Sequence, residues 1–256
     1  MAIRLVTIRV LSCSWARVEP TRGAYVDTEL DALASAIRAL REEGVEPVVV
    51  LHSGALPDWV IARHGWLDPD IIGLWGCYVD RVAQRIGVHV RWWAPFRGPL
   101  EEAAAYGADT RAALRALLDA HASAYLHLRR TQGFGGRSPE VGTFATWGAW
   151  RGEGVRGRAE AELRRRFGPD AWVRVLASGG LEAPFALVGE LSNGTPALDW
   201  IGVDWAGEVV FPGERSGGSC LEQRDQCLQR LASFGKPFLL NGGSERPAVG
   251  VRWVGG

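Results

Sequence analysis

Short apolar runs alternate along the chain with longer stretches in which apolar residues recur at every third or fourth position. Residues 27–44 follow that spacing with leucine and isoleucine, which is typical of an amphipathic helix, and Gly44 stands where a helix-terminating glycine belongs. Residues 45–53 contain a continuous Val/Leu run instead, the pattern of a strand that is buried on both faces. The hydrophobic pattern therefore predicts a helix followed by a buried strand.

The same two patterns continue to the end of the sequence. A second helix is predicted over 68–87, with Asp68 as its N-cap and Pro69 as its first helical residue. Further helices are predicted over 110–131, 157–168 and 220–235. Further strands are predicted over 3–15, 89–96, 140–148, 198–207, 236–243 and 248–256.

This alternation of strands and helices indicates an α/β fold. The favoured architecture is a (β/α)8 TIM-barrel-like domain, complete or incomplete, with six to eight strands. Neither a second composition regime nor a long linker divides the sequence, so residues 1–256 are expected to form one barrel domain. A dinucleotide-binding sheet is disfavoured, because no G-x-G-x-x-G follows a predicted strand.

Composition narrows the classes of partner and location. The 29 basic and 29 acidic residues balance, so neither nucleic acid nor a membrane surface is an expected partner, and a small molecule is. The sequence contains neither about 18 consecutive apolar residues nor a secretory signal, which predicts a cytoplasmic protein. The four cysteines lack C-x-x-C or zinc-site spacing, so free thiols and no metal or other cofactor are expected, with a Cys220–Cys227 bridge as the alternative for that pair.

In a barrel of this kind, functional residues lie at the C-terminal ends of the strands. The residues that the predicted strands bring there are Cys13, Trp15, Arg17, His52, Ser53, Phe96, Arg97, Thr146, Trp147, Asp204, Trp205, Asn241 and Trp253.

Several segments around these positions have sequences that occur together elsewhere. They are SWARVEPTRGAYV, GVEPVVVLHSGALPDWV, GWLDPDII, VRWWAPFRGP, LDAHASAYLHLR, LDWIGVDW and FGKPFLLNGG. In this order they resemble glycoside hydrolase family 1, the β-glucosidase-like barrels, over roughly residues 10–245. The resemblance implies the same barrel scaffold, because framework and catalytic residues are separate evidence.

The resemblance fails at the two catalytic positions. Members of the family are retaining glycosidases in which one glutamate of an Asn-Glu-Pro motif is the acid/base and another in Thr-Glu-Asn-Gly is the nucleophile. Here the first motif is replaced by RGP, which places Gly98 at the acid/base position. The second is replaced by NGG, which places Gly242 at the nucleophile position, and Glu245 is too far along the chain to be a good substitute. The resemblance therefore implies a pseudoglycosidase, without glycosidase activity.

The sugar-binding positions depart from the family as well. The family's paired histidines correspond to His52 and Ser53, and its Asn-Tyr-Tyr corresponds to the segment that begins at Asp204 and Trp205. The family's first strand, with its sugar-binding glutamine, and its late tryptophan segment have no counterpart in the sequence.

Three residues are candidates for new chemistry. Asp204 follows a strand among tryptophans and can act as a general acid or base, or else cap a helix or pair with an arginine. His52 ends a buried strand and is either an acid/base group or a histidine satisfied in the core. Arg97 is either an electrostatic clamp for a substrate carboxylate, phosphate or carbonyl, or the partner of Asp204 or Glu19 in an ion pair.

The remaining candidates are binding residues. Strand-end tryptophans can line a site for a planar or cyclic ligand, although each of them can equally be core filler. The predicted substrate-binding residues are Trp15, Arg17, Ser53, Trp93, Trp147, Trp205 and Asn241.

Two main functional hypotheses follow, beside a third in which glycosidase activity remains with an external acid/base and nucleophile. The first is a hydrolase-like or cyclase/isomerase-like enzyme that acts on a small aromatic or natural-product-like metabolite. The second is a non-catalytic ligand-binding or accessory protein on a glycosidase scaffold. An incomplete barrel exposes sheet edges, so either the terminal segments MAIRLVTI and VGVRWVGG close the ring or a homodimer covers the gap.

Overall fold

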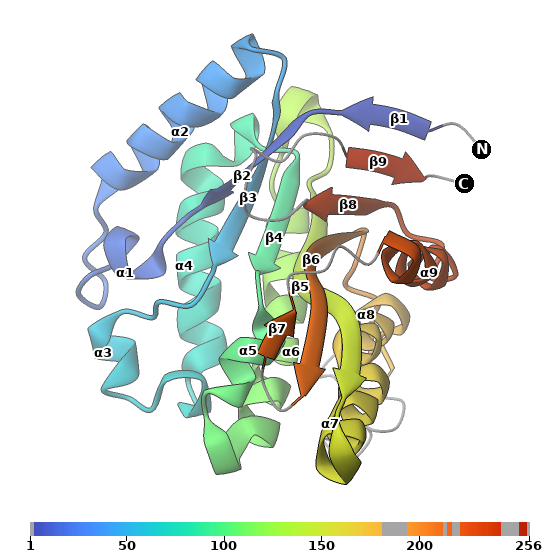
Figure 1. The fold of residues 1–256 in the computed structure, drawn as a ribbon. Coiled ribbons are helices and arrows are strands. Elements are labelled where there is room, and N and C mark those ends of the chain that lie inside the picture. The colour runs from blue at the N-terminus through green and yellow to red at the C-terminus, as the bar shows by residue number, and fades with distance from the viewer. Residues whose placement is uncertain (1–2, 181–193, 212–213, 217–220, 242–250, 255–256) are drawn as a thin grey trace.

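The protein is built on one curved sheet of parallel strands. The computed structural model describes residues 3–180, 194–211, 214–216, 221–241 and 251–254 (Figure 1). In their order across the sheet, the parallel strands are β2 (Ile8–Ser12), β3 (Glu46–His52), β4 (Trp92–Phe96), β5 (Glu140–Gly152), β6 (Trp200–Phe211) and β8 (Phe238–Asn241). The predicted TIM-barrel-like fold is thereby confirmed as a half-barrel of parallel strands, the incomplete form of the expectation.

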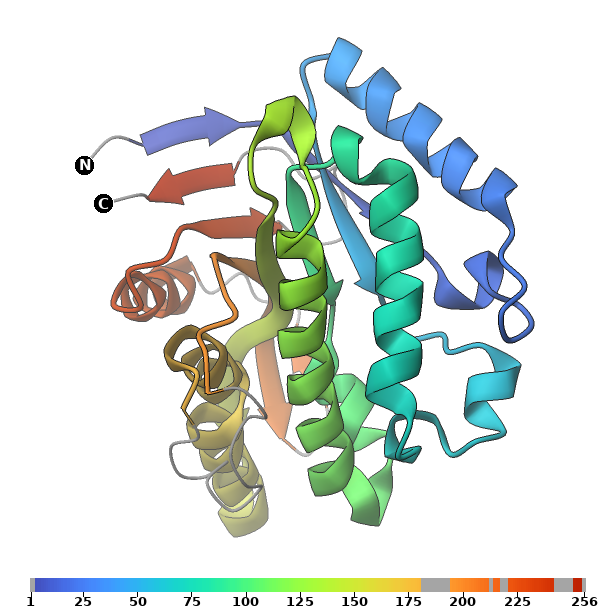
Figure 2. The same ribbon diagram turned by 180° about the vertical axis from the view of Figure 1, so that it is seen from behind.

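Helices cover one face of this sheet, as the view from behind shows (Figure 2). The longer ones are α2 (Asp27–Glu42), α4 (Ile71–Ile86), α6 (Thr110–Arg129), α7 (Gly154–Phe167), α8 (Pro169–Ser178) and α9 (Leu221–Ala232). Short helical turns follow the strand ends: α1 (Trp15–Val18), α3 (Asp58–Ile61), α5 (Pro99–Ala104), η1 (Gly65–Leu67) and η3 (Gly107–Asp109). Two others precede the starts of β4 and β5: η2 (Gly87–His89) and η4 (Phe134–Gly136).

The Val/Leu run of β3 shows why the strands are apolar throughout. Val49 and Leu51 belong to the core between sheet and helices, whereas Val48 and Val50 belong to a second core on the face away from the helices. Both faces of the strand are therefore out of water, and each fully buried valine or leucine side chain contributes about 1.5–3 kcal/mol of hydrophobic stabilisation.

The second core is filled by large aromatic side chains that lie against glycines of the neighbouring strand. Trp200 of β6 covers Gly142 of β5, and Phe144 of β5 covers Gly202 of β6. A Cβ at either glycine would overlap the adjacent ring, so both positions must remain glycine for the aromatic layer to form. This layer extends from the strand starts, where Trp200 lies, to Phe144, on the face away from the helices.

The terminal strands differ from the prediction. The single strand expected over 3–15 is two, β1 (Ile3–Val6) and β2, and β1 pairs antiparallel with β9 (Val251–Val254) in a separate two-stranded sheet. Strand β9 lies between β1 and β8 (Figures 1 and 2). The terminal segments pair with one another in a sheet of their own, so within the described residues they do not close the ring, and the homodimer alternative stays a prediction. Strand β7 (Glu214–Ser216) pairs antiparallel with the end of β6 and was not predicted.

The N-cap predicted for α4 is wrong. The helix begins at Ile71 with Asp70 in the cap position, two residues later than expected. Asp68 instead accepts the backbone N–H of Asp70 at 2.8 Å and forms an ion pair with Arg63. The carboxylate stabilises the turn before the helix, and the pKa of Asp68 is lowered chiefly by its hydrogen bond with Arg63.

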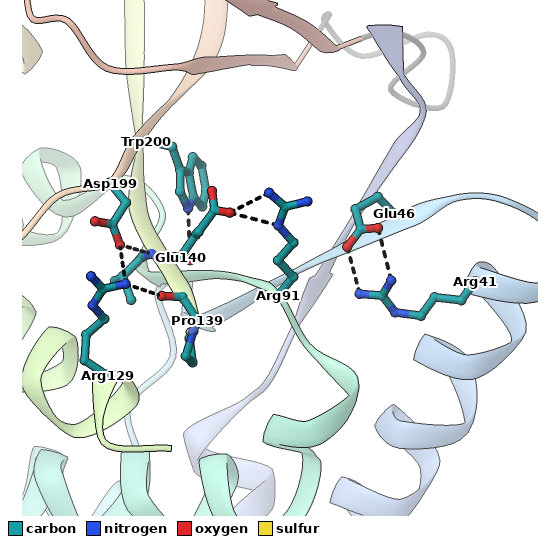
Figure 3. A network of polar contacts seen from close by, with 9 residues as sticks. Arg41, Glu46, Arg91, Arg129, Pro139, Glu140, Asp199 and Trp200 are labelled. Atoms are coloured by element: carbon teal, nitrogen blue, oxygen red, sulfur yellow. Dashed lines mark hydrogen bonds and ion pairs between the residues drawn. The ribbon is translucent and has the colours of Figure 1, made fainter. Parts of the chain in front are cut away.

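Ion pairs gather where the parallel strands begin, the end opposite to the candidate site (Figure 3). Arg41 donates to both carboxylate oxygens of Glu46 at 3.1 and 2.7 Å, which ties α2 to the start of β3. Arg91 donates from Nε and Nη2 to Glu140 Oε1 at 2.8 and 2.6 Å, across the starts of β4 and β5.

The start of β6 is fixed by a carboxylate as well. Asp199 accepts the backbone N–H of Val141 at 2.9 Å and lies 3.8 Å from Arg129, which donates to the carbonyl oxygen of Pro139 at 3.0 Å (Figure 3). The indole of Trp200 donates to the carbonyl oxygen of Glu140 at 3.2 Å. These contacts join loops to strands, and we assign them a structural role.

None of the helices in the described part of the chain is long and apolar enough to cross a membrane. Within the same residues, no three His, Cys, Asp or Glu side chains come together as metal ligands.

Candidate functional site

An arginine–carboxylate pair occupies the C-terminal ends of β4 and β6. Arg97 donates from Nε to Asp204 Oδ2 at 2.8 Å and from Nη2 to Asp204 Oδ1 at 2.9 Å. The arginine side chain is 38% exposed and the aspartate side chain 17%, so the pair lies at the margin of the core. This bidentate geometry confirms the ion-pair interpretation of Arg97, with Asp204 as the partner.

Backbone contacts fix the position of the arginine. The N–H of Arg97 donates to the carbonyl oxygen of His52 at 3.0 Å, and the N–H of Gly98 donates to that of Phe144 at 3.1 Å. The guanidinium carbon lies 5.8 Å from the centroid of the Phe144 ring, in the core on the face away from the helices. Asp204 follows Trp200 and Gly202 at alternate positions of β6, so it faces the same side.

Glu19, the other partner considered for Arg97, is engaged elsewhere. Its carboxylate accepts the indole N–H of Trp15 at 2.8 Å and the backbone N–H of Gly23 at 2.8 Å. Glu19 is buried and holds the loop after α1, so it does not take part in the strand-end site.

Gly98 stands directly after Arg97 in a left-handed conformation, with φ 71° and ψ 44°. Side chains rarely adopt this backbone conformation, and a glutamate here would be strained. A Cβ built at Gly98 would lie 3.4 Å from Oε2 of Glu101, on the first turn of α5. The position that the family motif assigns to the acid/base residue therefore has a backbone suited to glycine.

His52 lies at the end of β3 and is only 2% exposed. Its imidazole is enclosed by three aromatic rings, with centroid distances of 5.4 Å to Trp66, 6.4 Å to Trp75 and 5.9 Å to Phe96. Nε2 lies 3.5 Å from Glu102 Oε1, an ion-pair contact when the histidine is protonated, though too long to be a good hydrogen bond.

Glu102 is the polar residue that sequence reasoning missed. Its Oε1 accepts the indole N–H of Trp66 at 3.0 Å, and its side chain is 16% exposed. Burial raises the pKa of Glu102, but the neighbouring His52 and the Trp66 hydrogen bond outweigh it, and the net pKa lies below the usual value. The acidic pair EE directly after RGPL was the available signal, because these residues form the first turn after the acid/base position.

The smaller polar residues lie nearby on β2, β3 and β8. Ser53 donates to the hydroxyl of Ser12 at 3.3 Å, which joins the ends of β2 and β3. Asn241 is the last residue of β8 and stands in register with Asp204 of β6. Its neighbours Gly242 and Glu245 lie outside the described residues, so the assignment of Gly242 to the nucleophile position stays a prediction from the sequence.

The structure corrects the predicted placement of the tryptophans. Trp15, Trp93 and Trp147 are at most 1% exposed and belong to the core between sheet and helices. Trp205 is partly buried and packs against the same core. Side chains alternate along a strand, so these residues of β4, β5 and β6 point toward the helices, away from the Arg97–Asp204 pair.

Arg17 is also displaced from the site. Its side chain is 71% exposed and pairs with Glu29 of α2 at 2.6 Å. The short helix α1 turns this side chain toward α2, so a role for Arg17 in binding at the strand ends is not compatible with its position.

The described cysteines are free thiols, as expected. Cys13 and Cys227 are buried and Cys77 is exposed. Burial raises the pKa of Cys13 and that of Cys227 to about 11, so both are protonated and unreactive at neutral pH. Cys220 lies outside the described residues.

The fold and the strand-end site together define an α/β protein on a TIM-barrel scaffold. The family model described as Glycosyl hydrolase family 1 matches residues 1–109, a segment that contains β2, β3, β4 and Gly98. The match supports a relationship to that family for the N-terminal part of the chain.

Curated relatives match the same part. Beta-glucosidase 40 of Arabidopsis thaliana is 34% identical over 90 residues, which cover 34% of this chain and 18% of that protein. Coniferin beta-glucosidase of Pinus contorta is 31% identical over 90 residues, with the same two shares. Human lactase/phlorizin hydrolase is 31% identical over 91 residues, 35% of this chain and 5% of that protein. The matched segment thus spans less than a fifth of each relative's length.

Solved structures extend the similarity of fold to most of the chain. The beta-glucosidase from Thermotoga maritima in complex with noeuromycin superposes with a TM-score of 0.75 at 20% identity, covering 92% of this chain and 62% of that one. The AHE enzyme from Alicyclobacillus herbarius gives a TM-score of 0.75 at 17% identity, with the same coverage. The scaffold is therefore that of a β-glucosidase-like barrel.

Proposed function

We propose that this chain is a pseudoglycosidase, a β-glucosidase-like barrel that lacks glycosidase activity and acts on another small metabolite. The proposed reaction is a hydrolysis, cyclisation or rearrangement that proceeds by acid–base chemistry at the strand ends. A cytoplasmic location, a homodimer and the absence of a cofactor belong to the same proposal.

The observation that carries this proposal is the conformation of Gly98. It lies inside the segment that matches the family, at the position of the acid/base glutamate, and its φ of 71° disfavours any side chain. The preceding residue, Arg97, forms a bidentate pair with Asp204. A retaining glycosidase needs a carboxylic acid at this place to protonate the leaving oxygen, and a glycine cannot supply it.

The charged groups that remain suit a different chemistry. Asp204 holds the guanidinium of Arg97 through Nε and Nη2, and the arginine side chain is still 38% exposed. An arginine fixed in this way can stabilise negative charge that develops on a substrate oxygen. The aromatic character of the metabolite has less support than the polar chemistry, because the tryptophans Trp15, Trp93 and Trp147 are core residues.

The alternative is a non-catalytic ligand-binding or accessory protein on the same scaffold. The Arg97–Asp204 pair favours it, because each charge is already neutralised by the other. In that case the strand ends bind a ligand without changing it.

An assay with 2,4-dinitrophenyl β-glucoside tests the loss of glycosidase activity. This leaving group departs without protonation, and added azide or formate can replace a missing nucleophile or acid/base carboxylate. We expect no turnover above the buffer rate in any of these conditions. Turnover with retention of configuration would overturn the proposal, and turnover only with azide or formate would indicate a glycosidase site that has lost its carboxylates but still binds glucose.

A further inference from the structure

We propose that Glu102 and His52 form an acid–base pair at the strand ends, in which Glu102 exchanges the proton with the substrate and His52 positions Glu102. The inference rests on the proposed function, since it names the group that performs its proton transfer. Neither residue corresponds to a carboxylate of the family motifs, because Gly98 stands at the acid/base position.

Glu102 lies close in the fold to the position that lacks the acid/base side chain. Its backbone N–H donates to the carbonyl oxygen of Gly98 at 3.0 Å, so it lies one helical turn beyond the position that lacks a side chain. Helix α5 starts at Pro99, directly after Gly98, and its first turn contains both Glu101 and Glu102. The chain thus returns a carboxylate to the neighbourhood of the lost acid/base group.

The carboxylate of Glu102 is held from two sides. Trp66 of η1 donates its indole N–H to Oε1 at 3.0 Å, and His52 of β3 approaches the same oxygen at 3.5 Å. The backbone N–H of Trp66 in turn donates to the hydroxyl of Tyr106, which follows α5. A carboxylate that is fixed in this way loses little freedom on binding a substrate, which is the requirement for a positioned acid or base.

The imidazole of His52 is buried without a hydrogen-bond partner among the described residues. Both ring nitrogens are out of water and make no hydrogen bond of good geometry with any described residue. Buried polar atoms are nearly always satisfied, and unsatisfied ones need a functional or structural reason. The carboxylate of Glu102 at 3.5 Å is the nearby group that can take up a proton from Nε2, and a small movement of α5 would close this contact.

The other ionisable groups around the pair do not compete for its proton. Arg97, whose N–H bonds to the carbonyl oxygen of His52, is neutralised by Asp204. Glu101 on the same turn is exposed and lies toward Gly98. Burial raises the pKa of Tyr106, so its hydroxyl stays protonated at neutral pH.

The chemistry of the pair can be written for an ester probe. A water oxygen forms a bond with the carbonyl carbon, and the proton of that water passes to the carboxylate of Glu102. The C–O bond to the leaving group then breaks, and 4-nitrophenolate departs with the electron pair. Glu102 releases its proton to solvent, so that the carboxylate is restored and no other reactant is needed.

The pairing is tested by carbon-13 NMR of the full chain labelled at the glutamate carboxyl carbon, with the Glu102 signal assigned by its loss in Glu102→Gln. We expect His52→Phe, which keeps an aromatic ring in the cage, to raise the pKa of Glu102, because the burial that raises it is then opposed by Trp66 alone. Glu101→Gln, on the same helical turn, is the control and should leave the Glu102 titration unchanged.

An unchanged Glu102 titration in His52→Phe would overturn the pairing. If that variant does not fold, His52→Asn gives the same test, because it also removes the imidazole. The role in catalysis has a separate readout, the pH–rate profile with 4-nitrophenyl acetate. Wild type should lose its rate as pH falls through the pKa of Glu102, and Glu102→Gln should be slower by about 100-fold, the usual size of a general acid–base contribution.

Failure of the Glu102 assignment and failure of the proposed function are distinguishable. A coupled titration without any ester turnover would support the pair and contradict its role as acid–base group, and with it the proposed enzyme. Turnover that is equal in wild type and Glu102→Gln would contradict the assignment of Glu102 while leaving the proposed enzyme in place.

Discussion

The two ends of the parallel sheet carry the same kind of ion pair and use it differently. At the starts of the strands, Arg91 and Glu140 join adjacent strands, and Arg41 and Glu46 join a helix to its following strand (Figure 3). At the strand ends, Arg97 of the β4 end reaches past β5 to Asp204 of β6. The first set ties loops to the sheet, whereas the second occupies the face where such barrels perform chemistry.

The difference shows that the role of an ion pair depends on the residues around it. The pairs at the strand starts are surrounded by backbone carbonyls and loop residues. The Arg97–Asp204 pair is flanked by a glycine in the left-handed conformation. His52, with two ring nitrogens that lack a hydrogen bond, lies at the end of the adjacent strand β3. A buried polar atom without a hydrogen bond needs a functional or structural reason, and among the described residues none of the strand-start ion pairs lies beside such a histidine.

Lowering the pH should produce the largest difference in stability between the two ends of the sheet. His121 of α6 is fully buried 6.3 Å from the Phe96 ring at the end of β4, and burial lowers its pKa to about 4. The unfolded chain binds a proton at this histidine below its ordinary pKa of 6.5, and the folded chain does not until pH 4. Stability is therefore lost as pH falls from 6.5 to 4, by about 3 kcal/mol.

Denaturant titrations at pH 7, 5 and 4 measure this loss, and hydrogen exchange at pH 5 locates it. We expect amides of α6 and the end of β4 to lose protection before those at the strand starts. His121→Gln, which keeps a donor for the Ala197 carbonyl, should have a flatter pH dependence. An equal slope in both proteins would contradict the role of His121.

Gly98→Glu, the substitution that restores the family residue, should destabilise the protein without restoring activity. The backbone at this position has φ 71°, and a side chain there costs about 1–3 kcal/mol of strain. Thermal unfolding and the dinitrophenyl glucoside assay measure the two effects. Gly98→Asn is the control, because asparagine tolerates the left-handed region better than glutamate does. A stable, active Gly98→Glu protein would show that the strand end still supports the old site.

Asp204→Asn should have a smaller effect on stability. It leaves the charge of Arg97 without a partner, but the 38% exposure of that side chain lets water compensate, so the expected loss is about 1 kcal/mol. A double-mutant cycle with Arg97→Met isolates the coupling between the two side chains. A coupling near zero would mean that the pair is not formed in solution.

Glu140→Gln should have the smallest effect. It weakens one half-exposed pair at the strand starts, and the expected loss is about 0.5 kcal/mol. The variant should keep the Glu102 titration and any ester turnover of the wild type. A change in either would show that the two ends of the sheet are coupled.

Much of the fold is predictable because its elements are long and periodic. The Val/Leu run of β3 and the leucine spacing of α2 are local signals, and local signals are sufficient for such elements. Helix α8 was missed because it is only ten residues long and begins directly after α7, at a Gly-Pro pair that is typical of a turn. Strand β1 was joined to β2 because its partner, β9, lies at the other end of the sequence.

The site was predicted less well, because the sequence does not show toward which face a strand-end side chain points. Asp204 and Arg97 were recognised from the ends of their strands, but which face a strand-end side chain takes depends on the pleat and on local irregularities. Trp93 and Trp147 were therefore assigned to the wrong face. The role of Glu102 depends on its contact with Trp66, which is 36 residues away in the sequence. No local sequence pattern contains such a contact.

The most direct test of the central claim is whether the strand ends still bind a glucose mimic. Deoxynojirimycin is such a compound, and the Thermotoga maritima beta-glucosidase has been solved in complex with it. Isothermal titration calorimetry of the wild-type chain with deoxynojirimycin should show no binding at ligand concentrations up to about 1 mM. Any binding free energy would then be weaker than about −4 kcal/mol. A dissociation constant in the micromolar range would contradict the claim that this face has left glycoside chemistry.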